Sequence, residues 1–365
     1  MKYIDQLNLY KGSLAYKNYK IFCSKIIEFI DKSEINNDDA PSEYWKEELE
    51  GFKYMLDASP FIVNKLREHC YHITGVHSYP YRSHHSHSSK SFENKLNQLK
   101  KVDPNNLLIG ESSEMGGFGH NINGDLINID TLKFYESLIA LDKFGIIKKQ
   151  TNNNSKFIAL EIGGGWGGFG YQFKKTIPNS TYIIIDLPGT LLFSSVYLST
   201  IFPDAKIYFY DKSTLESLKN NIAEYDFIFL PHFVIDEIIL NKINLGINMV
   251  SFQEMTENQV ITYLKWLKNS NCESIYSHNK AKSPHNNQIS DVHELIANFY
   301  DIKEYKVLDV PYTVLNQPKN IQQLKKPLKE IYKYAKSIYL NEKEPSQQIH
   351  TNSNLYRHMI GELKK

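Results

Sequence analysis

A glycine-rich turn between two apolar segments constrains the fold of this chain more than any other feature. The apolar segment 157–160 is followed by Glu161 and then by the turn GGGWGGFG at 163–170, which leads into a segment of helical character. A second apolar segment, 182–185, ends in Asp186. A strand, a glycine turn, a helix and a second strand that ends in an acid form the first half of a nucleotide-binding α/β sheet, in which ligands bind beyond the carboxyl ends of the strands.

The acid ahead of the turn indicates which ligand the turn can accept. Gly163, Gly165 and Gly168 fit the dinucleotide pattern G-x-G-x-x-G, and Asp186 lies where a ribose-binding acid is expected, which on its own favours an NAD-dependent dehydrogenase. Glu161, however, stands two residues before the first glycine, where its carboxylate would repel a pyrophosphate. S-adenosylmethionine carries an ammonium and a sulfonium but no phosphate, so a carboxylate attracts it while the glycines allow close backbone approach. We predict methyl-donor chemistry. The alternatives are an NAD-dependent sugar oxidoreductase or epimerase, and glycines that only form a tight turn.

The composition excludes several other classes of protein. The chain has 365 residues, of which 41% are hydrophobic and 23% charged, and its formal net charge is +1, so neither nucleic acid nor an acidic membrane is an expected partner. Its three cysteines, Cys23, Cys70 and Cys272, lack metal-ligand or C-x-x-C spacing, as is typical of a reducing cytosol. The sequence has no apolar run of membrane-spanning length and no signal-peptide core near its start. These features predict a cytoplasmic protein without a membrane span.

Two parts of the chain differ in their periodicity. Residues 1–105 are predicted to form a helical cap, which supplies either substrate contacts or a dimer surface, and residues 106–365 are predicted to form the cofactor-binding domain. Helices are expected in the cap at 16–29, 43–56 and 61–71. Strands after the glycine turn are expected at 206–210, 226–230, 245–250 and 273–277, with a strand pair at 307–315 and a helical tail from 327. Strands that alternate with helices predict a doubly wound, mostly parallel, Rossmann-like α/β sheet.

A histidine-rich segment, GVHSYPYRSHHSHSSKS at 75–91, lies in the cap. Its four histidines lack the i, i+4 pairing or the accompanying carboxylate that would define a metal geometry, so no metal site is predicted. One interpretation is a lid that closes over a sugar, with Tyr81, Arg82 and His85 as hydrogen-bonding groups. The other is a disordered polar surface.

With these residues the chain resembles the bacterial sugar O-methyltransferases, class I enzymes that depend on S-adenosylmethionine and often serve surface-polysaccharide biosynthesis. The matching motifs are EIGGGWGGFG at 161–170, YIIIDLPGTLLFSSVYLS at 182–199 and NMVSFQEM at 248–255. Weaker matches are GGFG at 116–119, NIDTLKFY at 128–135 and YRHMIG at 356–361. Together they span most of the chain beyond residue 105. The first hundred residues match no motif, so the resemblance leaves the identity of the acceptor sugar open.

The resemblance implies a set of donor-binding residues at the strand ends. They are Glu161, Gly163 and Gly165 at the methionine portion, Asp186 at the ribose, Leu187, Leu230 and Pro231 at the adenine, and Asn248 and Ser251 at the sulfonium. The acceptor would be a sugar, a nucleotide-sugar or a glycan. Independently of the resemblance, the aromatic, helical N-terminus favours a homodimer.

Methyl transfer to a sugar hydroxyl requires a base that removes the hydroxyl proton in the transition state. The candidates at strand ends or in loops are His278, which we favour, then His120, with Glu254 and His232. A non-enzymatic alternative is a binding module that keeps a methyltransferase fold without catalysis.

Overall fold

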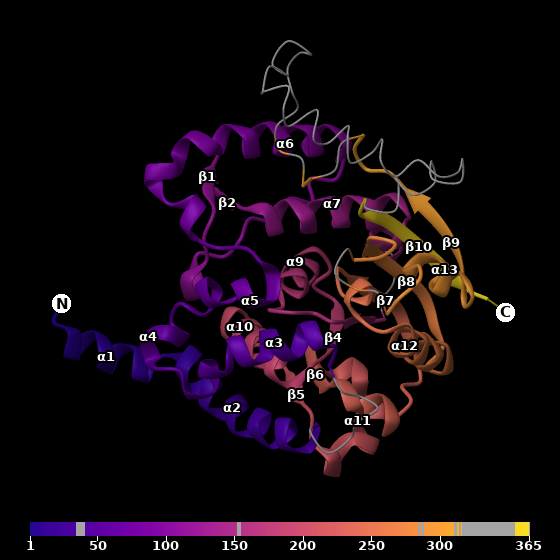
Figure 1. Ribbon diagram of the computed structural model, residues 1–365, viewed down its shortest axis with the longest axis horizontal. Helices are drawn as coiled ribbons and strands as arrows, with labels where there is room; N and C mark the ends of the chain where they lie inside the picture. The colour runs from indigo at the N-terminus through magenta and orange to yellow at the C-terminus, as the bar shows by residue number, and fades with distance from the viewer. Residues whose placement is uncertain are drawn as a thin grey trace, which may run out of the picture.

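An eight-stranded sheet organises the structure, a computed structural model that describes residues 1–33, 41–151, 155–283, 286, 288–309, 312, 313, 315 and 355–364 (Figure 1). The strand order is β5-β6-β4-β3-β7-β8-β10-β9. β10 runs antiparallel to both of its neighbours, and the other paired strands are parallel. The strands are β3 (Phe157–Ile162), β4 (Ser180–Asp186), β5 (Ile207–Phe209), β6 (Phe227–Pro231), β7 (Ile243–Met249), β8 (Cys272–Asn279), β9 (Tyr300–Tyr305) and β10 (Arg357–Leu363). The predicted mostly parallel α/β sheet is confirmed.

Both faces of the sheet are covered. Every residue of β3, β4 and β6 is buried, although consecutive side chains of a strand point to opposite faces. The helices that follow the strands or precede the sheet are α7 (Ile129–Lys143), α8 (Ile146–Thr151), α9 (Gly168–Thr176), α10 (Pro188–Ile201), α11 (Leu215–Asn221), α12 (Glu257–Asn269) and α13 (Val292–Ala297). This arrangement confirms the doubly wound architecture, and it leaves only the strand ends open to a ligand.

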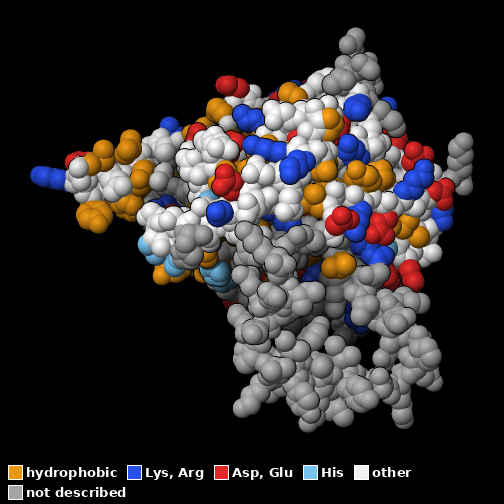
Figure 2. Space-filling model, turned by 90° about the horizontal axis from the view of Figure 1, so that it is seen from above, with side chains coloured by type: hydrophobic (Ala, Val, Ile, Leu, Met, Phe, Trp, Pro, Cys, Tyr) orange, Lys and Arg blue, Asp and Glu red, His pale blue; other side chains and the backbone are white. Residues whose placement is uncertain are grey.

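The N-terminal helices pack against the sheet domain. The predicted amphipathic helix is present as α2 (Leu14–Ser33), which lies along α10 because its buried side chains recur every three or four residues. Phe22 and Phe29 of α2 reach Phe209 of β5, with ring centroids 4.8 Å and 5.8 Å apart. The other helices of this part are α1 (Tyr3–Gly12), α3 (Glu43–Gly51), α4 (Pro60–Val63), α5 (Tyr71–Thr74) and α6 (Ser89–Val102). None of the residues of α1 is buried, and this helix projects from the body with hydrophobic side chains exposed (Figure 2).

Two predicted helices of the cap are shorter than expected. The helix over 43–56 ends at Gly51, a poor helix former, and continues as a 3-10 turn at Lys53–Asp57. The helix over 61–71 is divided into α4 and α5 by a 3-10 turn at Leu66–His69. The histidine-rich segment forms two 3-10 turns beside α6, followed by a small hairpin of β1 (His120–Ile122) and β2 (Asp125–Ile127).

The C-terminal predictions need correction. The tail was expected to be helical, but 357–363 forms strand β10 between β8 and β9. Residues 307–309 do not form a strand, and the strand lies earlier, as β9. Positions 310, 311, 314 and 327–354 of these predictions lie outside the described residues. A strand that pairs with partners far away in the sequence leaves little local signal, which explains both errors.

Candidate functional site

A cavity of about 490 Å³ lies at the carboxyl edge of the sheet, which is a typical size for a site that encloses a small ligand. The residues that line it follow the order of the strands: His232 after β6, Asp186 at the end of β4, Glu161 near the end of β3 and Ser251 after β7. Tyr356, which precedes the antiparallel β10, lines the cavity from the same edge. Because neighbouring strands lie about 4.8 Å apart, these side chains form a row along the cavity.

The glycine turn lies at the centre of this row. Gly163, Gly165 and Gly167 have φ angles of +74°, +57° and +83°, in the left-handed region that side chains disfavour. A Cβ atom at position 163 would lie 2.1 Å from Oγ of Ser251, so this position also lacks room for one. The glycines therefore let the ends of β3 and β7 approach each other closely.

Three amide groups of the turn are already engaged within the protein. Gly163, Gly165 and Gly167 each donate a backbone hydrogen bond. The acceptors are the Ile185 carbonyl (2.8 Å), the Asp186 carboxylate (2.8 Å) and the Gly164 carbonyl (3.0 Å), respectively. A turn that binds pyrophosphate presents its amides to the phosphate oxygens. These three amides are not available for that role.

Glu161 is a buried acid in the wall of the cavity. This residue is only 2% exposed, and its Oε2 accepts a hydrogen bond of 2.8 Å from the Tyr182 hydroxyl. Burial raises the pKa of Glu161 to about 8, the Tyr182 hydrogen bond lowers it, and the nearby Asp186 raises it. A cation placed against Glu161 would favour the ionised carboxylate and would be bound in return.

Asp186 is held rigidly at the end of β4. Its Oδ2 accepts from the Gly165 amide at 2.8 Å, and its Oδ1 accepts from the Leu187 amide at 2.7 Å. Burial raises the pKa of Asp186 to about 7, and the two backbone hydrogen bonds lower it. Each carboxylate oxygen retains a lone pair for a further donor, such as a ribose hydroxyl.

The segment after β7 is strained where it meets the cavity. Val250 has a φ of +55°, which is unusual for a β-branched residue, and its amide donates to the His278 carbonyl at 3.0 Å. Strain of this kind is often found at functional sites. Asn248 links this segment to β3: its Nδ2 donates to the Ile162 carbonyl and its Oδ1 accepts from the Phe252 amide, both at 2.9 Å.

Glu254 lines the cavity beyond Ser251. Burial raises the pKa of Glu254 to about 7, whereas side-chain hydrogen bonds with Trp45 and Gln253 and the charge of Lys133 lower it. Because β7 lies on the far side of β3 from β4, Glu254 and Asp186 are separated by Glu161 along the row. The cavity therefore has an Asp186 side and a Glu254 side.

The wall on the Glu254 side is rich in aromatic and amide side chains. It includes the beginning of α12, which has a capping box: Thr256 Oγ1 accepts from the Gln259 amide at 3.3 Å, and Gln259 Oε1 accepts from the Thr256 amide at 3.0 Å. The aromatic and amide residues of this wall are Tyr44, Trp45, Tyr263, Tyr356, Asn258 and Gln259.

The structure places the favoured base, His278, outside the residues that line the cavity. Its side chain is 1% exposed, stacks on His358 with ring centroids 4.1 Å apart, and has Nδ1 3.3 Å from Oγ of Ser137. Burial lowers the pKa of His278. Tyr356, whose ring centroid lies 5.6 Å from that of His278, lines the cavity instead. The end of strand β8 was predicted correctly, but its partner strand β10, which covers this histidine, was not.

His120 also lies away from the cavity. It belongs to the β1–β2 hairpin, where it contacts Tyr81 and Phe92, and its Nε2 lies 3.0 Å from Oγ of Ser88. Of the four predicted base candidates, the cavity wall contains Glu254 and His232.

The predicted donor-binding residues are divided in the same way. Six of them line the cavity: Glu161, Gly163, Gly165, Asp186, Leu187 and Ser251. Leu230, Pro231 and Asn248 do not. Leu230 is fully buried in β6. The part of the wall where Leu230 and Pro231 were expected is formed by His232 and Ile235 from the following turn.

The residues predicted to contact the acceptor lie elsewhere. Tyr81 is half-buried and its hydroxyl accepts from the Ile129 amide at 3.1 Å. Arg82 is exposed with its guanidinium 5.3 Å from the centre of the Tyr79 ring, and His85 also packs against Tyr79, at 4.8 Å between ring centroids. None of the three lines the cavity.

Lys133 and Trp45 line the cavity but were not among the sequence-based candidates. Lys133 lies within the motif NIDTLKFY, which could have drawn attention to it. Trp45 lies in the cap, which matches no motif. Within the described ranges, no group of three or more His, Cys, Asp or Glu residues is arranged to hold a metal ion. Of the helices that the structure describes, none has the length and apolarity to cross a bilayer.

Comparison with known proteins gives only distant similarities. The sequence matches no protein-family model and no curated protein. Among solved structures, phosphoethanolamine N-methyltransferase 2 of Haemonchus contortus in complex with S-adenosyl-L-methionine aligns with a TM-score of 0.34 and 10% identity, over 66% of this chain and 61% of that chain. Human N-acetylserotonin methyltransferase in complex with S-adenosylmethionine aligns with a TM-score of 0.31 and 8% identity, over 79% of this chain and 69% of that chain. The YcgJ protein of Bacillus subtilis aligns with a TM-score of 0.35 and 12% identity, over 62% of this chain and 98% of that chain. At these low scores, the function has to be argued from the cavity itself.

Proposed function

We propose that the chain is an S-adenosylmethionine-dependent methyltransferase whose donor occupies the cavity at the carboxyl edge of the sheet. The observation that carries this proposal is the pair of buried acids, Glu161 and Asp186, on neighbouring strands beside a turn in which three amides already have acceptors within the protein. Glu161 would bind the ammonium of the methionine portion, because a cation offsets the burial that raises its pKa to about 8. Asp186 would bind the ribose hydroxyls, with the adenine beside Leu187 and Ile235.

The alternative NAD-dependent enzyme is less compatible with this cavity. A dinucleotide would bring its pyrophosphate against the glycine turn beside Glu161, whose ionised form would repel it. The amides of Gly163, Gly165 and Gly167 already have acceptors, so these three could not bind the phosphate oxygens.

The acceptor that we propose is a sugar hydroxyl, on a nucleotide-sugar or a glycan for surface polysaccharide made in the cytoplasm. A sugar ring presents C–H groups on its faces and hydroxyls around its edge. Aromatic rings such as Trp45 and Tyr356 suit the faces, and amides such as Asn258 suit the hydroxyls. The motif resemblance points to the same class of acceptor.

Glu254 is the base that we propose for the acceptor hydroxyl. The bound donor supplies an electrophilic methyl group on its sulfonium. Glu254 lies on the side of Glu161 away from Asp186, where the acceptor would approach, and its carboxylate would take the hydroxyl proton as the oxygen bonds to the methyl carbon. Such a base contributes about 10² to 10⁴ in rate. Trp45 and Gln253, which hydrogen-bond Glu254, would orient it.

Calorimetric titration with S-adenosylmethionine, S-adenosylhomocysteine and NADH tests the donor. We expect the two sulfur compounds to bind and NADH not to bind, and the reverse result would establish the dehydrogenase alternative. Incubation with S-adenosylmethionine labelled in its methyl group, together with nucleotide-sugars or glycan extracts, then tests transfer. Donor binding without transfer to any of these acceptors would favour the catalytically silent binding module.

A further inference from the structure

A lysine side chain faces the cavity. Among the described residues that line it, Lys133 of α7 is the one lysine or arginine, and its side chain is 15% exposed. Three acids, Glu161, Asp186 and Glu254, line the same cavity. An anionic group of a ligand would therefore be most stable against Lys133.

The ammonium of Lys133 forms an ion pair with a buried acid. Its Nζ lies 3.0 Å from Oδ1 of Asp130, one helical turn earlier, and the Asp130 side chain is almost fully buried. Oδ2 of Asp130 lies 2.8 Å from Nη2 of Arg67. Asp130 is thus shared between the two cations Arg67 and Lys133.

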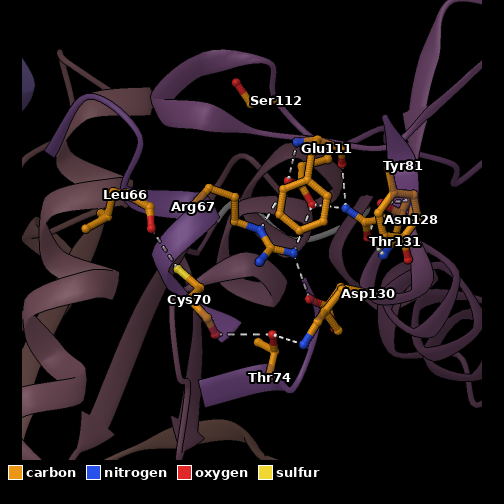
Figure 3. Close-up of polar contacts among 12 residues, drawn as sticks. Leu66, Arg67, Cys70, Thr74, Tyr81, Glu111, Ser112, Asn128, Asp130 and Thr131 are labelled. Carbon is orange, nitrogen blue, oxygen red and sulfur yellow. Dashed lines mark hydrogen bonds and ion pairs between the residues drawn. The ribbon is translucent and has the colours of Figure 1, made fainter. Parts of the chain in front are cut away.

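Arg67 anchors this arrangement in the core (Figure 3). It is fully buried, with its guanidinium between the rings of Phe118 and Trp166, at 4.6 Å and 4.0 Å from their centres. Its Nε lies 3.1 Å from Oε1 of Glu111, a second buried acid, which also accepts a hydrogen bond from the Asn128 amide (Figure 3).

We propose that Lys133 binds the carboxylate of the methionine portion of the donor, so that Lys133 and Glu161 together recognise a zwitterionic α-amino acid group. This inference rests on the proposed function. The carboxylate of the donor needs a positive partner once it is removed from water, and a charge-assisted hydrogen bond from a buried ammonium supplies one. Lys133 is near enough to Glu161 to lower the pKa of that acid, as the partner of a bound zwitterion must be.

Two ligands that differ only in the amino acid group test this inference. S-adenosylhomocysteine carries the ammonium and the carboxylate, and 5′-methylthioadenosine keeps the adenosine and the thioether but lacks both charges. Calorimetry on the full chain would compare the wild type with Lys133→Met, which keeps an apolar stem of similar length. Lys17→Met, on an exposed position of α2, is the matched control.

We expect Lys133→Met to weaken S-adenosylhomocysteine by about tenfold or more, the range of one hydrogen bond to a charged group, and to change methylthioadenosine by less than about twofold. Lys133→Arg should restore part of the difference. An equal loss of affinity for both ligands, or no loss for either, would overturn the role of Lys133 without contradicting the proposed donor site. If the wild type bound neither ligand, the proposed function would fail and this inference with it.

Discussion

The Tyr182 hydroxyl donates a 2.8 Å hydrogen bond to the Glu161 carboxyl between two neighbouring parallel strands. Both residues are buried, and their contact joins the core of the sheet to the wall of the cavity. The hydrogen bond favours the ionised form of an acid that burial otherwise keeps protonated. The readiness of Glu161 to receive a cation therefore depends on a residue that does not itself line the cavity.

Replacing Tyr182 by Phe removes this hydrogen bond, so the pKa of Glu161 should rise further. At pH 7 the variant should bind S-adenosylhomocysteine more weakly, by about three- to tenfold. The affinity should recover as pH rises, with its midpoint displaced to higher pH than in the wild type. Calorimetry across pH 6 to 9 measures both effects, and an unchanged midpoint would contradict them.

The stability of the ligand-free protein should fall as pH rises from about 6.5 to 8. The folded-state pKa values of Glu161 (about 8), Asp186 and Glu254 (both about 7) lie above their ordinary values, so these three acids hold more protons in the folded state than in the unfolded chain. That contribution to stability is fully present below the ordinary pKa values, and it is lost as pH passes through the folded-state values. Below about pH 6.5 buried histidines such as His278, whose pKa is lowered by burial, contribute in the opposite direction. Thermal unfolding at successive pH values measures the slope.

Glu161→Gln should flatten this slope and weaken donor binding together. The amide stays neutral at high pH, so the variant should unfold at a higher temperature than the wild type at pH 8. It should bind S-adenosylhomocysteine about tenfold or more weakly, because the ammonium loses its charged partner. Lower stability at pH 8 would show that the carboxylate is already satisfied without a ligand.

Gly163→Ala should destabilise the protein and abolish donor binding. The new Cβ would lie 2.1 Å from Oγ of Ser251, and the residue would keep a left-handed φ. Gly145→Ala is the matched control, since its φ is +79° but nothing lies within 4 Å of its Cβ position. We expect the control to lose about 1 to 2 kcal/mol of unfolding free energy and Gly163→Ala to lose more. Urea denaturation compares them, and equal losses would mean that the contact with Ser251 relaxes.

Glu254→Gln should leave S-adenosylhomocysteine affinity within about twofold and reduce turnover by about 10² to 10⁴. In the wild type the rate should fall as pH drops below the pKa of Glu254, about 7, because the protonated acid cannot accept the hydroxyl proton. The groups that act on this acid are Lys133, Glu48, Tyr44 and Tyr356, besides its hydrogen-bond partners. Glu216→Gln, exposed and remote from the cavity wall, serves as the control. A rate profile that keeps its acidic limb in Glu254→Gln would exclude this base.

Local patterns in the sequence were sufficient for the first half of the sheet. The succession of strand, glycine turn, helix, strand and acid lies within thirty residues, 157–186, and each step is encoded by neighbours in the chain. The same is true of the helix that begins after Thr256, because a capping box acts over one turn. The row of Asp186, Glu161 and Ser251 follows from these local elements once parallel strands bring their carboxyl ends together.

The tertiary structure alone decided which remaining groups face the ligand. His278 was a reasonable base as a strand-end histidine, but β10 returns from far along the chain and pairs Arg357 with Asn279, which brings Tyr356 to the cavity in its place. Lys133 faces the cavity because Asp130 and the distant Arg67 hold it there. Contacts between residues so widely separated are selected by packing and by the pairing of buried charges, and neither leaves a periodic signal in the sequence.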